Sequence, residues 1–466
     1  MTTRASELDR LENRFDELFP ITRSITGPGL RKSLEILGRD IPFQMEGVPS
    51  GTDVFDWTIP KEWRIKEAKL TGPNGETVVD FDETNLAVVN YSAPVDDYFS
   101  LEEIDSHLYT LPDKPDAFPY VTSYYERNWG FCLPHSVYEN LPEGEYHAYI
   151  DSEFVDGELN FGHATLPGRT DREILLTSYL CHPSLANNEL SGPLVLTALY
   201  NRLKQWDSRK FTYRFVLAPE TIGSLAYLSK MGRHLREKLV GGFVLTCLGG
   251  PEESLSYKRT RRGDAYVDTV VTHFDEYADK NVRMRPFNPR KGSDERQYCS
   301  PGFNFPVGQF ARTVYTEYEG YHNSLDSKEF MGIEPLVESA ATIEAILETV
   351  ECGGYYERTQ PFGEPMLSKY DLYPSVNDPS ERKTEGRTTE ENSERPADFI
   401  GNVMTLLNYA DGHHSVIDIA SELDTFALNL RSCLVPLLEN NLLRPVPHKP
   451  NYVQQMDIET VGETKL

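Results

Sequence analysis

In the middle of the chain, apolar runs are each followed by a polar loop and then by a segment with helical spacing. An apolar, β-favouring run at Ile174–Leu180 ends shortly before His182, and the later segment Pro193–Leu203 carries leucines at near-helical spacing. This pattern predicts a buried strand, a loop and a helix. It places His182, Asn188 and Glu189 at the carboxyl edge of a sheet, where open α/β folds hold their functional sites.

The same alternation continues toward the C-terminus. Strand-like runs at 211–218 and 242–248 alternate with segments of helical period at 264–277 and 334–349. Strands joined by helices favour parallel pairing. The sequence therefore predicts an α/β domain with a mostly parallel, mixed sheet and helices on both faces.

The first part of the chain has a different pattern. Apolar positions predict helices at 8–18 and 28–37, and strand-like runs at 63–70, 77–81 and 86–91 then replace them. The helices before these strands and the strand–loop–helix series after them indicate an inserted β-rich domain. The predicted boundaries are 1–48 and 115–360 for the α/β domain, and 49–114 for the insert.

The C-terminal part has a third character. We predict a linker at 361–396, because the stretch from Pro374 to Pro396 is charged and low in apolar residues. Three short helical patterns and a strand follow it, and this order resembles a winged helix. We therefore expect a winged-helix-like domain at 397–450. Since this segment is not basic, a docking or dimerisation role is favoured over DNA reading.

Composition and charge narrow the class of protein. A chain of 466 residues fits two or three domains, and 39% hydrophobic residues suffice for globular packing. The formal net charge of -27 makes nucleic acid a poor partner, because the phosphate backbone is itself negative. Six widely spaced cysteines without a CxxC pair are typical of a reduced, cytosolic protein. No signal peptide or membrane span is apparent in the sequence, so we expect a cytoplasmic location and no membrane partner.

Several loops carry side chains suited to metal binding or proton transfer. These candidates are His182, Asn188, Glu189, Glu220, Asp294, Glu295, His322 and Asp326. A hydrolytic zinc ion needs a few His and carboxylate ligands, an open position for water and a nearby Glu that accepts a proton. Taken singly, each residue also has an ordinary explanation. A lone His after a strand is more often structural, and a Glu after a proline, such as Glu220, fits a helix start.

The order of these motifs is more specific than any one of them. The chain contains a His after a strand, then Asn-Asn-Glu-Leu-Ser-Gly, Pro-Glu-Thr-Ile-Gly-Ser, Gly-Ser-Asp-Glu and Tyr-His-Asn-Ser-Leu-Asp-Ser. This order resembles the zinc aminopeptidase family over residues 1–50 and 115–355, which implies a zinc aminopeptidase/phosphorylase-like fold. The whole chain more closely resembles bacterial proteins called polysaccharide biosynthesis proteins with an aminopeptidase-like domain. The motifs that carry this closer likeness include Thr122–Cys132, Cys181–Ser184 and Tyr257–Asp264.

The resemblance assigns roles to individual residues. His182 and His322 match the two histidine ligands of the aminopeptidase motif, and Asn188 falls where that family has its metal-bridging Asp. Glu220 falls at the Glu-Glu pair, but Thr221 follows it, so one carboxylate remains to act as proton acceptor or ligand. The strand near Thr246–Cys247 also lacks the Asp that would hold a second metal. Too little negative charge remains for a paired-zinc centre.

We therefore expect at most one zinc ion, held by His182, His322 and either Asn188 or Glu189. Glu220 would polarise the water bound to that zinc.

Other residues would contact the substrate. Asp294 and Glu295 would lie at the rim and bind an ammonium group, and Arg296 would take a carboxylate. Tyr321 and Tyr124 would form pocket walls, although ordinary packing explains both tyrosines equally well. The basic run Tyr257–Arg262 either faces solvent or attracts an anionic substrate.

Two hypotheses from different classes follow. The leading one is a metal-dependent hydrolase of aminopeptidase type that cleaves an amide bond in a small peptide-like or aminoacyl substrate. The alternative is a binding or scaffold protein with the same fold and a decayed metal centre. In either case the insert and the winged helix are candidates for homo-oligomer contacts. A transcription factor fits the acidic charge badly.

Overall fold

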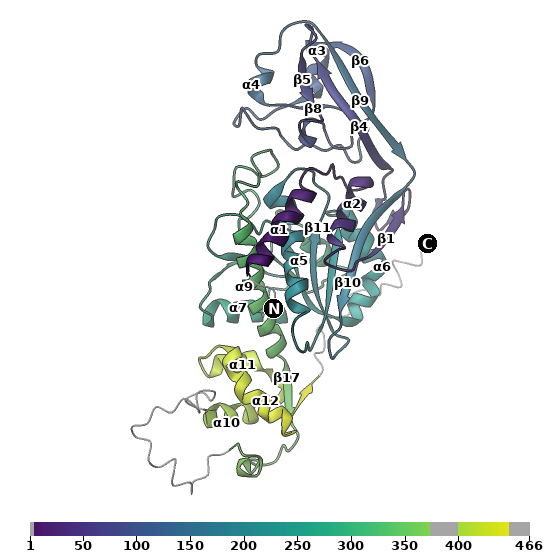
Figure 1. Cartoon of the computed structure of the whole chain (residues 1–466). Coiled ribbons are helices and arrows are strands. Elements are labelled where there is room, and N and C mark those ends of the chain that lie inside the picture. The colour runs from purple at the N-terminus through teal and green to yellow at the C-terminus, as the bar shows by residue number, and fades with distance from the viewer. Residues whose placement is uncertain (1–3, 373–398, 447–466) are drawn as a thin grey trace. The chain divides into compact units, whose positions relative to one another are not determined.

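The computed structural model describes residues 4–372 and 399–446 (Figure 1). The described residues form two compact units. The first contains 4–265 and 283–344, and the second contains 266–282 together with the described residues from 345 onward. From residue 373 onward, the predicted linker lies outside the described residues.

An eight-stranded sheet organises the first unit. Its strands, in spatial order, are β1 (Gln44–Pro49), β10 (Glu158–Leu166), β12 (Thr212–Ala218), β11 (Glu173–Tyr179), β13 (Leu239–Leu245), β16 (Val307–Ala311), β14 (Leu255–Lys258) and β15 (Val282–Arg285). The strands β12, β11, β13 and β16 pair in parallel. The strands β1, β10 and β14 pair antiparallel with their neighbours β10, β12 and β16. The predicted mixed, mostly parallel sheet is therefore confirmed.

Helices cover both faces of this sheet. Helix α5 (Ser191–Leu203) approaches β11 so closely that a Cβ atom on Gly192 would meet the Ser178 hydroxyl. Helix α6 (Ile222–Lys238) shares a hydrophobic core with Leu175 of the same strand. Side chains alternate along a strand, so Leu175 and Ser178 point to opposite faces. The two predicted N-terminal helices are confirmed as α1 (Arg4–Leu18), which contacts α5, and α2 (Pro28–Leu37), which contacts β10.

The β-rich insert is longer than the sequence indicated. Its four-stranded sheet has the order β5 (Thr77–Asp80), β4 (Glu62–Thr71), β9 (Glu145–Val155) and β6 (Val95–Ser100). Strand β9 lies beyond the predicted end at residue 114, yet it pairs with β4 over most of its length. Buried side chains of β4 and β9, with Phe131 and Leu133, form a hydrophobic core of their own.

Smaller elements complete the first unit. They are β2 (Asp53–Val54), β3 (Trp57–Thr58), η1 (Asn85–Ala87), α3 (Leu101–Ile104), η2 (Asp105–His107), β7 (Leu108–Tyr109), β8 (Phe131–Cys132), α4 (His135–Tyr138), η3 (Ala186–Leu190) and α8 (Glu295–Tyr298). The predicted strand at 86–91 is wrong, because the structure has the 3-10 helix η1 there, followed by isolated bridges at Val88 and Asn90. There the hydroxyl of Thr84 accepts the Leu86 N–H and caps the 3-10 helix η1.

The second unit has the helix and strand order of a winged helix. Its elements are α7 (Tyr266–Tyr277), β17 (Tyr355–Arg358), η4 (Leu367–Tyr370), α10 (Phe399–Tyr409), β18 (Asp411–Ser415), α11 (Val416–Glu422), η6 (Ala427–Leu430), α12 (Arg431–Glu439) and β19 (Leu443–Val446), with the end of α9 (Ile333–Cys352). The strand order is β18-β17-β19. Since β17 is the central strand, this domain begins well before the predicted boundary at residue 397.

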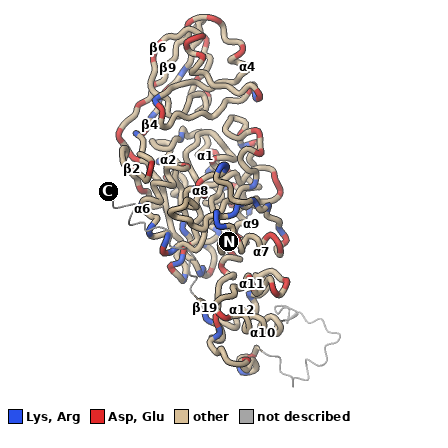
Figure 2. The backbone as a smooth tube through the Cα atoms, turned by 180° about the vertical axis from the view of Figure 1, so that it is seen from behind, with Lys and Arg blue, Asp and Glu red and all other residues tan. Residues whose placement is uncertain are grey.

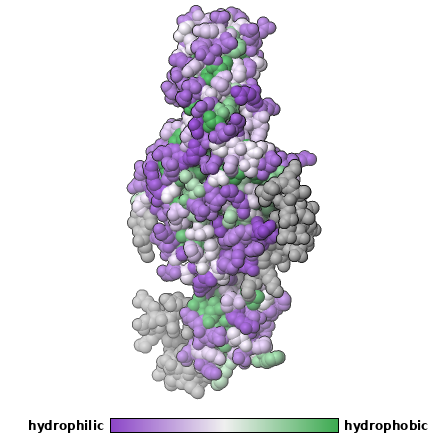
Figure 3. Space-filling view, turned by 90° about the vertical axis from the view of Figure 1, so that its right-hand side faces the viewer, coloured by the Kyte–Doolittle hydropathy of each residue, from purple (hydrophilic) through white to green (hydrophobic). Residues whose placement is uncertain are grey.

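Charge and hydropathy are spread over the chain. Acidic residues occur throughout both units (Figure 2), and the face drawn in Figure 3 is mainly hydrophilic with small apolar patches. None of the helices in the described part of the chain combines the length and apolar character that a membrane crossing requires. All six cysteines are free thiols with buried side chains.

Candidate active site

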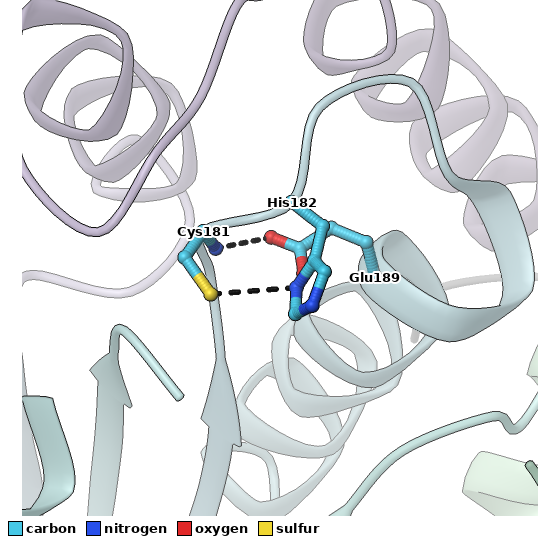
Figure 4. Close-up of side chains that lie close together, drawn as sticks. All are labelled: Cys181, His182 and Glu189. Atoms are coloured by element: carbon cyan, nitrogen blue, oxygen red, sulfur yellow. Dashed lines mark hydrogen bonds and ion pairs between the residues drawn. The ribbon is translucent and has the colours of Figure 1, made fainter. Parts of the chain in front are cut away.

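His182 is fixed from one side by a carboxylate. It follows β11, and its Nδ1 atom lies 2.8 Å from Oε2 of Glu189, which belongs to the short helix η3 before α5 (Figure 4). The backbone N–H of Cys181 donates to the other oxygen, Oε1, at 2.5 Å. Both carboxylate oxygens are therefore engaged on the Nδ1 side of the ring. A carboxylate in this position sets the tautomer and orientation of a histidine, and it is the usual companion of a metal-binding imidazole.

A buried guanidinium supports the same pair. Arg23 lies in the turn-rich connection between α1 and α2 and is completely buried. Its Nε atom donates to the carbonyl oxygen of His182 at 3.0 Å and lies 3.6 Å from Glu189 Oε1. The positive charge of Arg23 thus balances the buried carboxylate. This role of Arg23 could not be predicted from the sequence, because a single Arg in a polar turn is ordinarily exposed.

Glu220 faces the opposite nitrogen of His182. It follows β12, and its Oε2 atom lies 3.9 Å from His182 Nε2. The hydroxyl of Ser293 donates to its other oxygen, Oε1, at 2.6 Å. The Glu220 side chain is 28% exposed, in contrast to the fully buried Glu189. The carboxylate of Glu220 is therefore oriented toward both His182 and solvent.

His322 completes the imidazole pair. Its ring centroid lies 5.4 Å from that of His182, and the ring of Tyr321 stacks on it at 4.0 Å. The backbone has the left-handed φ of 56°, and the His322 carbonyl accepts the Tyr120 N–H at 2.9 Å. Burial and the neighbouring His182 lower the pKa of His322 to about 3. His322 is therefore neutral at physiological pH and keeps a lone pair for a metal ion.

Asn188 has a buried oxygen with no partner. Its Nδ2 donates to the hydroxyl of Tyr179 at 2.9 Å, whereas its Oδ1 has no hydrogen-bond donor. The backbone N–H groups of Asn187 and Asn188 donate to Asp326 at 2.6 and 2.8 Å. Burial raises the pKa of Asp326 to about 6, even though these bonds act against it. Asp326 thus holds the η3 turn in place, and Asn188 Oδ1 is left as an unsatisfied acceptor.

The predicted rim residues occupy other positions. Asp294 is buried, and its Oδ1 accepts the Thr221 N–H at 2.7 Å. Burial and the nearby Glu220 carboxylate raise the pKa of Asp294 well above its usual range. Glu295 is fully buried and lies 2.6 Å from Lys258 Nζ, the ammonium group of the basic run Tyr257–Arg262. The predicted rim position is therefore wrong for both acids, because each is buried and has a partner inside the fold.

Arg296 and the two tyrosines differ in their surroundings. Arg296 is half-buried, and its Nε donates to the Ser293 carbonyl at 3.2 Å. Tyr321 packs on His322, as described above. The hydroxyl groups of Tyr124 and Tyr120 are hydrogen-bonded at 2.7 Å. Tyr124 also lines a cavity of about 250 Å³. His182 and Glu220 lie in the wall of the same cavity.

The spacing of one pair of ligand atoms suits a single metal ion. Two ligands of a tetrahedral zinc ion lie about 3.4 Å apart, given bonds of about 2.1 Å, and His182 Nε2 and Glu220 Oε2 are 3.9 Å apart. The ring of His322 lies 5.4 Å from that of His182 between centroids, and Asn188 Oδ1 is a buried oxygen without a hydrogen-bond donor. Among the His, Cys, Asp and Glu side chains of the described residues, one group of three has ligand atoms within 4.8 Å of one another, namely Cys181, His182 and Glu189. That grouping uses His182 Nδ1, which Glu189 already engages, and it lies beside the Arg23 charge, so the Nε2 side fits a cation better.

Comparison with known proteins is consistent with this architecture. The family described as "Domain of unknown function (DUF4910)" matches residues 13–353, and a winged helix-turn-helix family matches residues 354–445. The chain belongs to the DUF4910 family. A curated relative of this DUF4910 chain, from Clostridium acetobutylicum, is 40% identical over 88% of this chain and 90% of its own length. It is named "Putative polysaccharide biosynthesis protein with aminopeptidase-like domain".

Solved structures similar to this DUF4910 chain carry the aminopeptidase fold. A crystal structure titled "putative peptidase" from C. acetobutylicum has a TM-score of 0.82 and 37% identity, covering 94% of this chain and 96% of its own. A zinc aminopeptidase from Bacillus subtilis has a TM-score of 0.54 and 11% identity, covering 73% of this chain and 95% of its own. The second likeness shows the fold alone. The chain is therefore an aminopeptidase-like protein with a C-terminal winged helix.

Proposed function

We propose that this DUF4910 chain is a metal-dependent hydrolase of aminopeptidase type, which uses one zinc ion to cleave an amide bond in a small peptide-like or aminoacyl substrate. The observation that carries the proposal is the two-sided setting of His182. Glu189 engages Nδ1, while Nε2 faces the carboxylate of Glu220 across 3.9 Å. This arrangement prepares Nε2 to bind a cation.

The residues that would hold the zinc ion are His182, His322 and Asn188, with Glu220 beside them. When bound, zinc would lower the pKa of a water molecule and polarise the substrate carbonyl. Glu220 is the one carboxylate among these residues, and it lines the cavity. The neighbouring carboxylate of Glu189 is turned to the Nδ1 side of His182. This low negative charge favours one metal ion over two.

Glu220 is the proposed proton acceptor. Ser293 donates to Oε1, so the carboxylate keeps a fixed orientation with Oε2 toward His182. A water molecule between these groups would give a proton to Oε2, and the same oxygen could return that proton to the leaving amine. General bases of this kind contribute about 10²–10⁴-fold to a rate.

A binding or scaffold protein is the second candidate function, and Asn188 is the observation that favours it. An amide at the position of a metal-bridging carboxylate removes a negative charge from the site. The two candidates differ in one respect that can be measured, because a scaffold requires no hydrolysis.

A hydrolysis screen tests the proposal. The zinc-loaded protein is incubated with a panel of aminoacyl p-nitroanilides, and release of p-nitroaniline is followed beside Glu220→Gln and the exposed control Glu253→Gln. The proposal predicts hydrolysis by wild type and by the control, and a loss of at least about 100-fold in Glu220→Gln. Hydrolysis that survives Glu220→Gln, or zinc-loaded protein without activity on any substrate of the panel, would favour the scaffold.

A further inference from the structure

The cavity beside His182 and Glu220 has an aromatic wall. Its aromatic lining residues are Trp57, Tyr124 and Tyr125. The other lining residues are Ile25, Cys181, His182, Glu220, Thr221 and Ile222. Apart from His182 and Glu220, no lining residue has a side chain that is charged at neutral pH. The volume of about 250 Å³ is slightly below the roughly 300–1,000 Å³ typical of drug-sized ligands. The cavity thus suits one large uncharged side chain better than an extended peptide.

Two of the wall residues are exposed although they are large and aromatic. Trp57 is 39% exposed and Tyr125 is 52% exposed, and their rings meet edge to face at 5.4 Å. Large exposed aromatic side chains that gather beside a reactive carboxylate are typical of a ligand-binding surface. A third ring could add to such a pair, since edge-to-face contacts extend readily.

The wall is held in place by packing from behind. The hydroxyl of Tyr124 is hydrogen-bonded to the hydroxyl of Tyr120. The ring of Tyr124 packs edge to face on that of Tyr91, with 5.4 Å between the ring centroids. Trp57 lies in the hairpin β2–β3, which is closed by hydrogen bonds between Thr52 and Ile59 and between Gly51 and Ile59. At the tip of this hairpin, Phe55 packs on Phe303 at 5.6 Å. A ligand would therefore meet a preformed surface.

We propose that Trp57 and Tyr125 select a substrate whose amino-terminal residue carries an aromatic ring. The ring lies against the Trp57–Tyr125 pair, and the scissile amide then lies near Glu220 and His182. This inference rests on the proposed hydrolase function for the position of the amide. The binding preference itself depends only on the wall. The hairpin and the segment around Tyr125 thus determine specificity and take no part in proton transfer.

Ligand binding tests the inference apart from catalysis. L-phenylalanine and L-alanine are titrated by calorimetry into the zinc-loaded full-length protein, its Trp57→Ala and Trp57→Phe variants, and Asp56→Ala. Asp56→Ala is the matched control, because Asp56 lies in the same hairpin, is exposed and is outside the cavity lining. Thermal unfolding of each variant shows that it is folded.

The inference predicts that wild type binds phenylalanine about tenfold more tightly than alanine, as expected for one added aromatic contact and its buried area. Trp57→Ala removes that difference, whereas Trp57→Phe restores most of it and Asp56→Ala retains it. Equal binding of the two amino acids by wild type, absence of binding, or a preference unchanged in Trp57→Ala would overturn it.

The phenylalanyl and alanyl p-nitroanilides separate this inference from the proposed function. Preferential binding of phenylalanine without hydrolysis of either compound would support the aromatic binding site and contradict the proposed hydrolase function. Hydrolysis of both compounds at equal kcat/KM, with no binding preference that depends on Trp57, would support the hydrolase function and contradict the aromatic binding site.

Discussion

Glu189 Oε2 lies 2.8 Å from Nδ1 of His182, on the side of the ring opposite to Glu220. A carboxylate that holds Nδ1–H makes Nε2 the nitrogen available to a metal ion. The sequence placed both Asn188 and Glu189 among the candidate ligands. The geometry favours Glu189 as the group that orients His182, which leaves Asn188 as the proposed donor.

Replacing Glu189 by Gln should weaken zinc binding without removing a ligand. The amide keeps the shape of the side chain but loses the charge that fixes the His182 tautomer. Loss of such an outer partner lowers metal affinity by about 10–100-fold. Competition with a chromophoric chelator measures this change, and Glu253→Gln is the control. Unchanged affinity would show that Glu189 does not support the ligand, and complete loss of binding would indicate that it is itself a ligand.

The buried pair Lys258–Glu295 should be important for stability. Lys258 Nζ also donates to the carbonyl oxygens of Asn288 and Lys291, so it holds the loop that carries Ser293. Lys258→Met leaves the Glu295 carboxylate buried without its cation, and breaking such a pair costs about 3–5 kcal/mol.

Chemical denaturation measures this loss, and Lys66→Met provides the surface comparison. Lys66 Nζ lies 3.6 Å from Asp151 Oδ2 on the protein surface, and the two side chains are 71% and 41% exposed. Its loss should change stability by less than about 1 kcal/mol. Equal effects of the two substitutions would contradict the structural role of Lys258.

The stability of the second unit should depend on pH through His273. This side chain is buried between Tyr277 and Phe426, and its Nε2 accepts the Ala427 N–H at 2.9 Å. Burial lowers the pKa of His273 to about 4, compared with the usual 6.5. The unfolded chain therefore binds more protons between these values. The contribution of His273 is complete above pH 6.5 and is lost as the pH falls toward 4, by up to about 3 kcal/mol.

Unfolding between pH 4 and 7.5, followed for wild type and His273→Gln, measures this dependence. The variant should show a flatter profile, whereas His413→Gln should behave like wild type, since His413 is exposed. A profile for His273→Gln as steep as that of wild type would exclude His273 as the titrating group.

The sequence predicted those parts of the fold that are set by local periodicity. The two N-terminal helices and the strand–loop–helix series around His182 were visible because their apolar residues repeat at helical or strand spacing. The insert boundary was not visible. Strand β9 has β character like that of β10, which follows it in the main sheet, and only its pairing with β4 assigns it to the insert.

The site was predictable to a similar degree. The proximity of His182, Glu220 and His322 could be predicted, because their motifs occur in a recognisable order along the chain. Arg23 and Ser293 could not, since their roles arise from contacts with His182 and Glu220 across long stretches of chain. Glu295 was placed at the rim because its partner Lys258 is 37 residues away in the sequence.

Metal content tests the central claim most directly. Elemental analysis of protein dialysed against zinc without chelator should give one equivalent of tightly bound zinc in wild type, and close to none in His182→Ala and His322→Ala, while all three proteins remain folded. Wild-type protein that binds no zinc, or either variant with undiminished zinc content, would contradict a metal centre built on these two histidines.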